Sequence, residues 1–316
     1  MNPFDYHQVA EAAAVPARLS AAVRPLAGGT DLLTRLKAGL DQPDALVDLK
    51  ASDLGWAIDR VDGGWRLGAL VTLSRIQDHP GLRADVPALI EAVSQAATPQ
   101  LRNRATIAGN LLQRPRCGYF RHPGVQCWLA GGEGCPARTG RNEHHAVFDT
   151  DGPCVATHPS DPAAALTALG ATVTVLGGNG ERELAVADLL RAPTEDRRVE
   201  HVLADDAVIT AVTVPSAPRS TYLKAMDRAV WAFALVGVAA AMSAADGEVR
   251  LVASGVANTP WRLAGAEAAL AGTGLTPDAI DRAAAAATDG AAPLAENGYK
   301  LPLLRALTHR ALTAIA

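Results

Sequence analysis

The sequence predicts a folded protein of mixed helices and strands, organised in two or three domains. Its 316 residues are more than a single minimal domain needs. Hydrophobic residues make up 49% and charged residues 20%, the balance of a chain that folds around a core. Because only 4% of the residues are aromatic, Ala, Val and Leu must build most of that core.

The first structural block ends near residue 50. A short apolar segment precedes a turn at Gly28-Gly29, and Thr30 or Asp31 can cap the helix that follows. Four leucines fall on roughly one face of that helix: Leu32, Leu33, Leu36 and Leu40. The apolar run 45–49 then predicts a short strand.

Two further blocks contain strand-like and helix-like segments. β-branched residues predict strands at 171–176 and 207–214, and residues 64–70 and 249–253 also resemble strands. The sequence predicts helices at 87–97, 277–288 and 301–315. Residues 215–220, PSAPRS, are typical of a linker before the third block. By contrast, residues 113–160 are irregular and rich in Gly and Pro, so we expect something other than regular packing to order them.

One segment is a candidate membrane span. Residues 229–245, AVWAFALVGVAAAMSAA, are uncharged over 17 positions, at the lower limit for crossing a bilayer. The segment is rich in Ala rather than Leu, and this composition favours a buried helix in a soluble core. We therefore expect no membrane insertion.

The charge balance narrows the functional classes. The formal net charge is −4, whereas proteins that bind nucleic acid or anionic membranes need a surplus of Lys and Arg. The first residues, MNPFDYHQVAEAAA, contain neither the basic nor the apolar segment of a secretory signal. We expect no nucleic-acid partner and, from the chain's own sequence, a cytoplasmic location.

Two glycine-containing turns are candidate ligand sites. In residues 27–31, AGGTD, the glycines would let a pyrophosphate approach backbone amides at the start of a helix, without any Lys. Residues 101–111, LRNRATIAGNL, offer Thr106, Gly109 and Asn110 for a similar role. Each segment could equally be an ordinary turn. The Rossmann and P-loop glycine patterns are both missing from the sequence, which disfavours those two folds.

All four cysteines lie within 38 residues, at Cys117, Cys127, Cys135 and Cys154. Such clustering indicates a metal site. The spacing C-x9-C-x7-C-x18-C matches neither a zinc ribbon nor the compact ferredoxin run, and a loop around an iron–sulfur cluster fits it better than a zinc finger. Two alternatives stay open, namely a zinc site and cysteines that bind no metal and are structural or free. Four nearby histidines could replace a ligand or simply be solvated: His122, His144, His145 and His158.

Two other polar residues are candidate cofactor contacts. Asp161 could accept hydrogen bonds from sugar or ribityl hydroxyls, or it could cap the helix that begins at Pro162. Lys224 could face a polar cofactor atom or be a solvated lysine. No GxSxG, HExxH or Cys/His nucleophile pattern occurs, so the chain need not supply a nucleophile or a general base.

Taken in order, the segments AGGTDLL, RNRATIAGN, HPSD and YLKAMDR resemble the FAD-binding subunit of the xanthine dehydrogenase family of molybdenum hydroxylases. The resemblance covers essentially the whole chain and implies an α+β fold. Residues 1–215 would form a two-subdomain FAD-binding domain of the vanillyl-alcohol-oxidase type, with subdomains at about 1–52 and 53–215. Residues 216–316 would form a smaller α+β C-terminal domain.

The resemblance also implies which residues hold FAD. One loop would wrap the pyrophosphate, and it consists of Leu26, Ala27, Gly28, Gly29, Thr30, Asp31, Leu32 and Leu33. Thr106 and the Gly109-Asn110 turn would close the other side. Asp161 would hold the ribityl or ribose region, Ile209 would pack near the flavin ring, and Lys224 would lie beside the isoalloxazine. The family's Arg-x-x-x-Asp pattern after that lysine is here Arg228-Ala-Val-Trp-Ala.

The 49 residues between Asn110 and Ser160 exceed the short connection usual in the family. A subgroup carries a [4Fe-4S] cluster in such an insertion, and the segments LLQRPRCGYF, GEGCPA, HHAVF and CVATHPSDP are most similar to its bacterial periplasmic aldehyde oxidoreductases. The resemblance thus implies that all four cysteines ligate one cluster. The FAD subunit of 4-hydroxybenzoyl-CoA reductase is an alternative.

The implied function is electron transfer within a heterotrimer. A partner with a molybdenum cofactor would oxidise an aldehyde, a second partner with [2Fe-2S] clusters would relay the electrons, and FAD in this chain would pass them to an acceptor. The complex would be periplasmic if a partner with a signal carried this chain across the membrane. Two other functions stay open: a stand-alone flavin dehydrogenase or oxidase, and a non-catalytic subunit with a structural zinc.

Overall fold

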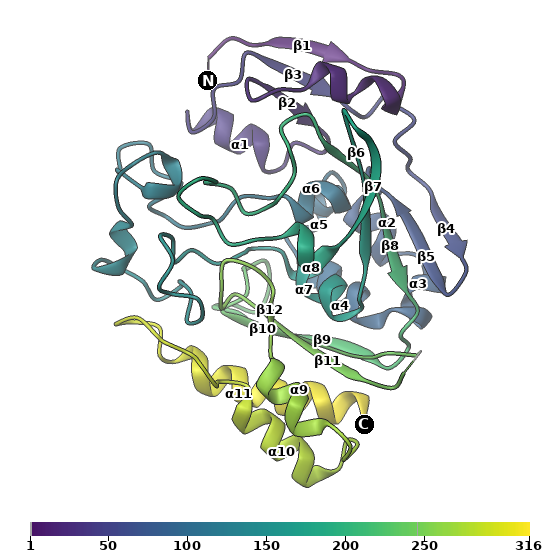
Figure 1. The fold of residues 1–316 in the computed structure, drawn as a ribbon, viewed down its shortest axis with the longest axis vertical. Helices are drawn as coiled ribbons and strands as arrows, with labels where there is room; N and C mark the ends of the chain where they lie inside the picture. Colours follow the sequence, from purple (N-terminus) through teal and green to yellow (C-terminus); the bar gives the residue numbers. More distant parts are fainter. Residues whose placement is uncertain (1, 245) are drawn as a thin grey trace.

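The computed structural model describes residues 2–244 and 246–316, and it contains three β-sheets with helices packed against them (Figure 1). The N-terminal sheet is parallel, in the order β1-β3-β2, and consists of β1 (Asp5–Gln8), β2 (Val23–Leu26) and β3 (Ala45–Asp48). Strand β3 confirms the strand predicted at 45–49. Helix α1 (Leu32–Lys37) follows the glycine turn but ends before Leu40.

The second sheet is antiparallel, in the order β4-β5-β8-β6-β7. Its strands are β4 (Ile58–Val61), β5 (Gly64–Gly68), β6 (Thr172–Gly177), β7 (Gly180–Ala185) and β8 (Val208–Pro215), and β5, β6 and β8 confirm three predictions. The helices of this region are α2 (Leu73–Gln77), α3 (Pro80–Asp85), α4 (Pro87–Gln95), α5 (Pro99–Arg102), α6 (Ile107–Leu111), α7 (Asp161–Ala168) and α8 (Val186–Leu189). Helix α4 confirms the helix predicted at 87–97.

The third sheet is also antiparallel, in the order β12-β11-β10-β9. It consists of β9 (Ser220–Ala225), β10 (Val236–Met242), β11 (Val249–Ser254) and β12 (Trp261–Arg262). Three helices follow: α9 (Ala264–Leu270), α10 (Pro277–Ala286) and α11 (Lys300–Ile315). Strand β11 and helices α10 and α11 confirm the predictions at 249–253, 277–288 and 301–315.

The helix predicted at 229–245 is wrong. Residues 236–242 form the interior strand β10, residues 229–235 form an irregular loop before it, and residue 245 lies outside the described residues. Val236, Val238 and Ala240 pack into the core shared with α10 and α11, whereas Ala239 and Ala241 pack into the core shared with α4 and α7. A strand buried on both faces lacks the alternation of apolar and polar residues that would identify it.

The third sheet therefore lies between two sets of helices. Helices α4 and α7 pack on one face, and α10 and α11 close the other (Figure 1). The domain division predicted at 215/216 falls between β8 and β9 and stays a prediction. Across the described residues, the structure contains no helix with the length and apolar character of a membrane span.

Candidate functional site

The Gly28-Gly29 turn lies against the second glycine-containing segment. A Cβ atom on Gly28 would lie 1.9 Å from the carbonyl oxygen of Arg104, so only glycine permits this approach. Gly29 has a φ of +73°, a conformation that glycine adopts without strain. The structure thus brings together the two turns that the sequence singled out.

The second turn is connected to the Ser-Asp pair of α7. Thr106 begins α6, and its hydroxyl oxygen accepts a hydrogen bond from the amide of Gly109 at 3.2 Å. Gly109 is exposed, so the backbone there is accessible to a ligand. The Ser160 hydroxyl donates to Oδ1 of Asn110 at 2.5 Å. The predicted pyrophosphate turn and the predicted ribityl region are therefore contiguous.

Asp161 and Lys224 form a buried ion pair. Oδ2 of Asp161 lies 2.7 Å from Nζ of Lys224, and the two side chains are 4% and 1% exposed. The Tyr222 hydroxyl donates to Oδ1 of Asp161 at 2.5 Å. Burial raises the pKa of Asp161, while Lys224 and Tyr222 oppose that rise. The sequence analysis identified Asp161 and Lys224 as separate candidates, and nothing in the sequence predicted that they contact each other.

Two alternatives considered for these residues are wrong. Helix α7 is capped by Ser160, whose hydroxyl oxygen accepts from the amide of Ala163 at 3.0 Å, so Asp161 is free to face Lys224. Lys224 is buried rather than solvated. Its ammonium also donates to the carbonyl of Gln95 at the end of α4.

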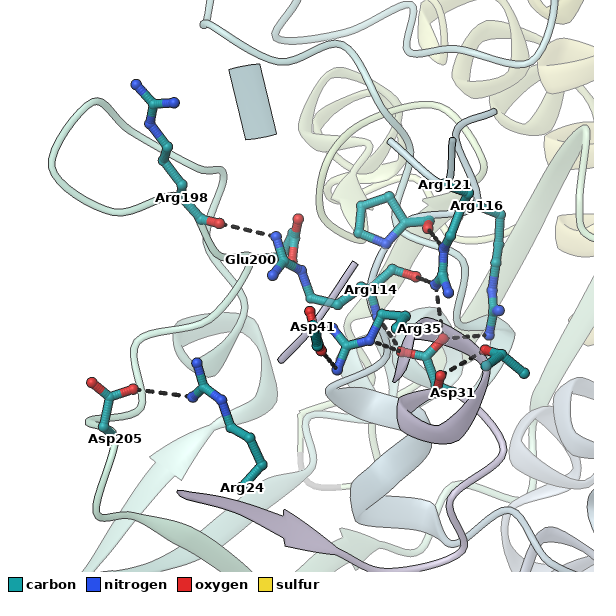
Figure 2. Close-up of polar contacts among 12 residues, drawn as sticks. Arg24, Asp31, Arg35, Asp41, Arg114, Arg116, Arg121, Arg198, Glu200 and Asp205 are labelled. Carbon is teal, nitrogen blue, oxygen red and sulfur yellow. Dashed lines mark hydrogen bonds and ion pairs between the residues drawn. The ribbon is translucent and has the colours of Figure 1, made fainter. Parts of the chain in front are cut away.

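Asp31 connects the glycine turn to the cysteine-containing insertion (Figure 2). Its Oδ1 lies 3.0 Å from Nη2 of Arg116 and 2.8 Å from Nη2 of Arg121. Its Oδ2 accepts from the backbone amide of Arg114 at 3.1 Å. Burial alone would raise the pKa of Asp31, but Arg116, Arg35 and Arg121 hold that pKa below its ordinary value. Asp31 therefore points away from the turn, and it makes no side-chain capping hydrogen bond to α1.

The arginines around Asp31 carry an excess of positive charge. Arg35 pairs with Asp41 at 2.9 Å and Arg114 with Glu200 at 2.8 Å, so four guanidinium groups, those of Arg35, Arg114, Arg116 and Arg121, face three carboxylates. Nε of Arg116 is buried without a hydrogen-bond partner among the described residues, whereas Nε of Arg114 lies 2.8 Å from Glu200 and Nε of Arg35 lies 3.5 Å from Asp31. Burial lowers the pKa of Arg116 to about 10, and Asp31 opposes this shift. Such a cluster fits an anionic ligand nearby.

The four cysteine thiols are free and lie near one another. Cys127 and Cys154 are buried in a small core with Phe120, Trp128 and Leu129, and Cys117 packs against it. Cys135 is within electrostatic range of the other three thiols. Burial raises the pKa of Cys117 to about 11 and that of Cys154 to about 12, so these two thiols are protonated at neutral pH without a metal.

Backbone amides act on three of these thiols. Those of Tyr119 and Phe120 oppose the rise in the pKa of Cys117 that burial causes, and those of Leu129 and Ala130 do the same for Cys127. The amide of Ala156 donates to the sulfur of Cys154 at 3.5 Å. Within residues 2–244 and 246–316, no three His, Cys, Asp or Glu side chains are spaced to hold a single metal ion.

The second half of the insertion packs into the C-terminal domain. Val147 and Phe148 belong to the core formed with α10 and α11, and Phe148 stacks on Trp261 with ring centroids 5.1 Å apart. The amides of both residues donate to the carbonyl of Val256. The expectation that packing cannot order this stretch is therefore wrong for its second half, whose apolar residues are too few to show periodicity.

The four histidines divide into two groups. His122 and His144 are exposed, whereas His145 and His158 are buried. Nδ1 of His158 accepts from the amide of Ser160, so its Nε2 donates to the carbonyl of Leu111 at 3.2 Å. Nε2 of His145 lies 3.2 Å from Sγ of Cys117. Burial, reinforced by Lys300, lowers the pKa of His145 to about 4.

A cleft of about 440 Å³ opens between the insertion and the C-terminal domain. Asp161 and Arg116 line it together with the loop between β9 and β10. That loop places Trp231 and Phe233 in the wall, about half exposed, where the sequence departs from the family's Arg-x-x-x-Asp pattern. The Arg116 guanidinium lies 5.2 Å from the centre of the Phe233 ring.

Not every predicted residue joins this arrangement. Ile209 lies in β8, 3% exposed in the core of the second sheet, and it is not among the residues that line the cleft. The sequence interpretation missed the arginines and Tyr222, and its solvated alternative is wrong for His145 and His158, which are buried. An Arg-x-Arg-Cys run directly before the first cysteine was the available signal for the arginines.

The arrangement is that of a flavoprotein domain, and comparisons with known proteins identify the family. Residues 2–217 match the model of the FAD binding domain in molybdopterin dehydrogenase. Residues 221–315 match the model of the CO dehydrogenase flavoprotein C-terminal domain. The chain belongs to the FAD-binding subunits of the molybdenum hydroxylases, which are subunits of oxidoreductases.

Individual relatives agree with this assignment. The aldehyde oxidoreductase FAD-binding subunit PaoB of Escherichia coli is 38% identical, with 96% of each chain covered. The nicotinate dehydrogenase FAD-subunit of Eubacterium barkeri is 27% identical over 81% of this chain and 74% of its own. A solved structure of carbon monoxide dehydrogenase from Hydrogenophaga pseudoflava has the same fold, with a TM-score of 0.77, 24% identity, and coverage of 99% of this chain and 97% of that one.

Proposed function

We propose that this chain is the FAD-bearing electron-transfer subunit of a molybdenum-dependent aldehyde oxidoreductase. Its partners would be a molybdenum-cofactor subunit and a [2Fe-2S] subunit, in a heterotrimer. The 38% identity to an aldehyde oxidoreductase subunit over 96% of the chain supports the aldehyde as the substrate class. That likeness is the observation that carries the proposal, and in the structure Asp31 joins the glycine turn to the segment that leads into Cys117.

The residues around the glycine turn fit FAD. The Gly28 approach to Arg104 and the exposed Gly109 leave backbone amides accessible, and the arginine cluster has one positive charge in excess. We assign the pyrophosphate to the turn from Leu26 to Leu33 with Thr106, Gly109 and Asn110. Bound FAD would supply the exchange between two-electron and one-electron transfer, and this chain would position and shield it.

The cleft between the insertion and the C-terminal domain fits the flavin ring. Its wall combines the apolar side chains of Trp231 and Phe233 with the carboxylate of Asp161. Lys224 holds that carboxylate in place from β9. In this assignment Asp161 contacts the ribityl side and Lys224 positions Asp161 without touching the ribityl chain. Ile209 lies in the core of the second sheet, outside the lining of this cleft, and is not assigned to the ring.

The donor set of the insertion fits a [4Fe-4S] cluster. Three thiols gather around one small core, with Cys135 within electrostatic range of them, and the amide of Ala156 donates to the sulfur of Cys154, as is favourable for a thiolate that bears shared negative charge. A tetrahedral zinc site would hold its sulfurs about 3.8 Å apart, since each Zn–S bond is about 2.3 Å. The described residues contain no such tight group, and the proposal of a cluster rests on the free thiols and on the resemblance of the insertion to cluster-bearing subunits. Such a cluster would supply a one-electron couple.

The complex purified anaerobically from its native cells tests the proposed function. Addition of an aldehyde should bleach the flavin absorbance of this chain only when the molybdenum-cofactor partner is present. The chain without its partners should bind FAD but show no bleaching with aldehyde. Bleaching of the isolated chain by an aldehyde would contradict the proposal and support the stand-alone flavoenzyme.

A further inference from the structure

We propose that His145 donates a hydrogen bond to the sulfur of Cys117 and thereby raises the reduction potential of the cluster. The inference rests on the cluster proposed above. Nε2 of His145 lies 3.2 Å from Sγ of Cys117, within the range of a hydrogen bond to sulfur. His145 is a positioning residue in this account, because the four cysteines complete the ligand set without it.

The chemistry of the sulfur determines where the imidazole proton lies. As a metal ligand, Cys117 is a thiolate and offers no S–H donor. The nitrogen that faces it must carry the proton, since a bare nitrogen would direct a lone pair at a negative sulfur. Nδ1 of His145 is buried and makes no hydrogen bond among the described residues, although the backbone carbonyl of Asn142 acts on the ring and opposes the fall of its pKa.

Two buried side chains of the C-terminal domain hold His145 in place. The carbonyl oxygen of His145 accepts from Nζ of Lys300 at 2.7 Å and from Nδ2 of Asn297 at 3.1 Å. Both donors are fully buried, and Nζ of Lys300 also donates to the carbonyl of Gly255 at 2.6 Å. Burial lowers the pKa of Lys300 to about 7, and its amine satisfies its hydrogen bonds on two backbone carbonyls of this region, which holds the backbone of His145. The imidazole is limited by its own burial, since His145 is 7% exposed.

A donor at this sulfur favours the reduced state. One-electron reduction adds negative charge to the ligand sulfurs, and a hydrogen bond to a sulfur stabilises the more negative state more strongly. Loss of the donor should lower the midpoint potential. Loss of a residue with a purely structural role would alter iron content or stability without this directed shift.

The test compares three variants of the anaerobically purified complex in a redox titration followed by electron paramagnetic resonance. His145→Phe keeps a planar ring but removes the donor, whereas His145→Gln retains an N–H group. His144→Phe is the control, since His144 is the neighbouring histidine with a 59% exposed side chain. We expect a lower midpoint for His145→Phe, a value nearer wild type for His145→Gln, and no change for His144→Phe.

An iron-loaded His145→Phe complex with the wild-type midpoint would overturn the inference. Absence of iron from the wild-type complex would instead overturn the cluster itself, so the two failures are distinguishable. If His145→Phe loses iron, its midpoint cannot be measured. The hydrogen bond is then tested directly by electron–nuclear double resonance on the reduced wild-type complex, prepared with ¹⁵N-labelled histidine. An exchangeable proton coupled to the cluster together with a histidine nitrogen supports the inference, and the lack of both couplings overturns it.

Discussion

Nη2 of Arg116 lies 3.0 Å from Oδ1 of Asp31, so the residue before the first cysteine is bound to the residue that follows the glycine turn. The same carboxylate binds Arg121 and the amide of Arg114 (Figure 2). The pyrophosphate turn and the insertion are thus held by one carboxylate. A change at Asp31 should affect both proposed cofactor sites.

We predict that Asp31→Asn destabilises the chain by about 3 kcal/mol, because breaking a buried ion pair leaves uncompensated charge. The matched control is Asp205→Asn. Asp205 pairs with Arg24 at the surface, where the two side chains are 58% and 43% exposed. That change should cost roughly 1 kcal/mol or less. Urea unfolding of the cofactor-free chain measures the loss of unfolding free energy in both variants. Equal unfolding midpoints for the two would show that the buried ion pairs of Asp31 contribute no more than the exposed pair.

The effect of Asp31 should depend on pH. Its pKa is lowered in the folded chain, so its contribution to stability is complete above the ordinary Asp pKa of about 3.9 and is lost as the pH falls through the folded value. The difference in unfolding free energy between wild type and Asp31→Asn should therefore be constant near neutrality and shrink below about pH 4. A difference that grows on acidification would contradict the assignment.

Lys224→Met should destabilise the chain by about 3–5 kcal/mol, because Asp161 would keep its burial and lose its ammonium partner. The double variant Asp161→Asn with Lys224→Met removes both charges and should recover part of that loss. Thermal unfolding of the single and double variants gives the coupling between the two side chains. Additive losses would mean that the pair does not act as a unit.

Gly109→Val should lower FAD affinity at least tenfold, equivalent to about 1.4 kcal/mol, while the fold is kept. Gly109 is exposed, and an added Cβ would meet Oγ1 of Thr106 at 2.9 Å and no other atom, so the Thr106 side chain must shift to accept it. Gly28 is less suitable, because a Cβ there meets the backbone of Arg104 at 1.9 Å and would disturb the turn itself. The control is Gly298→Val, with open space around its Cβ. Flavin fluorescence after unfolding measures the bound FAD, and full occupancy in Gly109→Val would remove this turn from the site.

Local sequence patterns predicted much of the secondary structure but little of the site's connectivity. The strand at 45–49 and the helix at 87–97 follow from apolar spacing, and the structure has both. Strand β10 was misassigned because both of its faces are buried, which removes the alternation that marks a strand. No spacing rule links Asp31 to Arg116, or Asp161 to Lys224, since these pairs depend on how distant segments pack.

The direct measurement of the central claim is the content of iron, acid-labile sulfide, zinc and FAD in the anaerobically purified complex, in wild type and in Cys117→Ser, Cys127→Ser, Cys135→Ser and Cys154→Ser. The iron of the [2Fe-2S] partner is the same in all samples, so the difference between wild type and each variant gives the iron held by this chain. Each variant should lose the same amount of iron and sulfide, while FAD is largely retained. The account predicts a loss of about four iron and four sulfide per FAD, the composition of one [4Fe-4S] cluster on Cys ligands. Stoichiometric zinc in the wild type, or unchanged iron in the four variants, would contradict it.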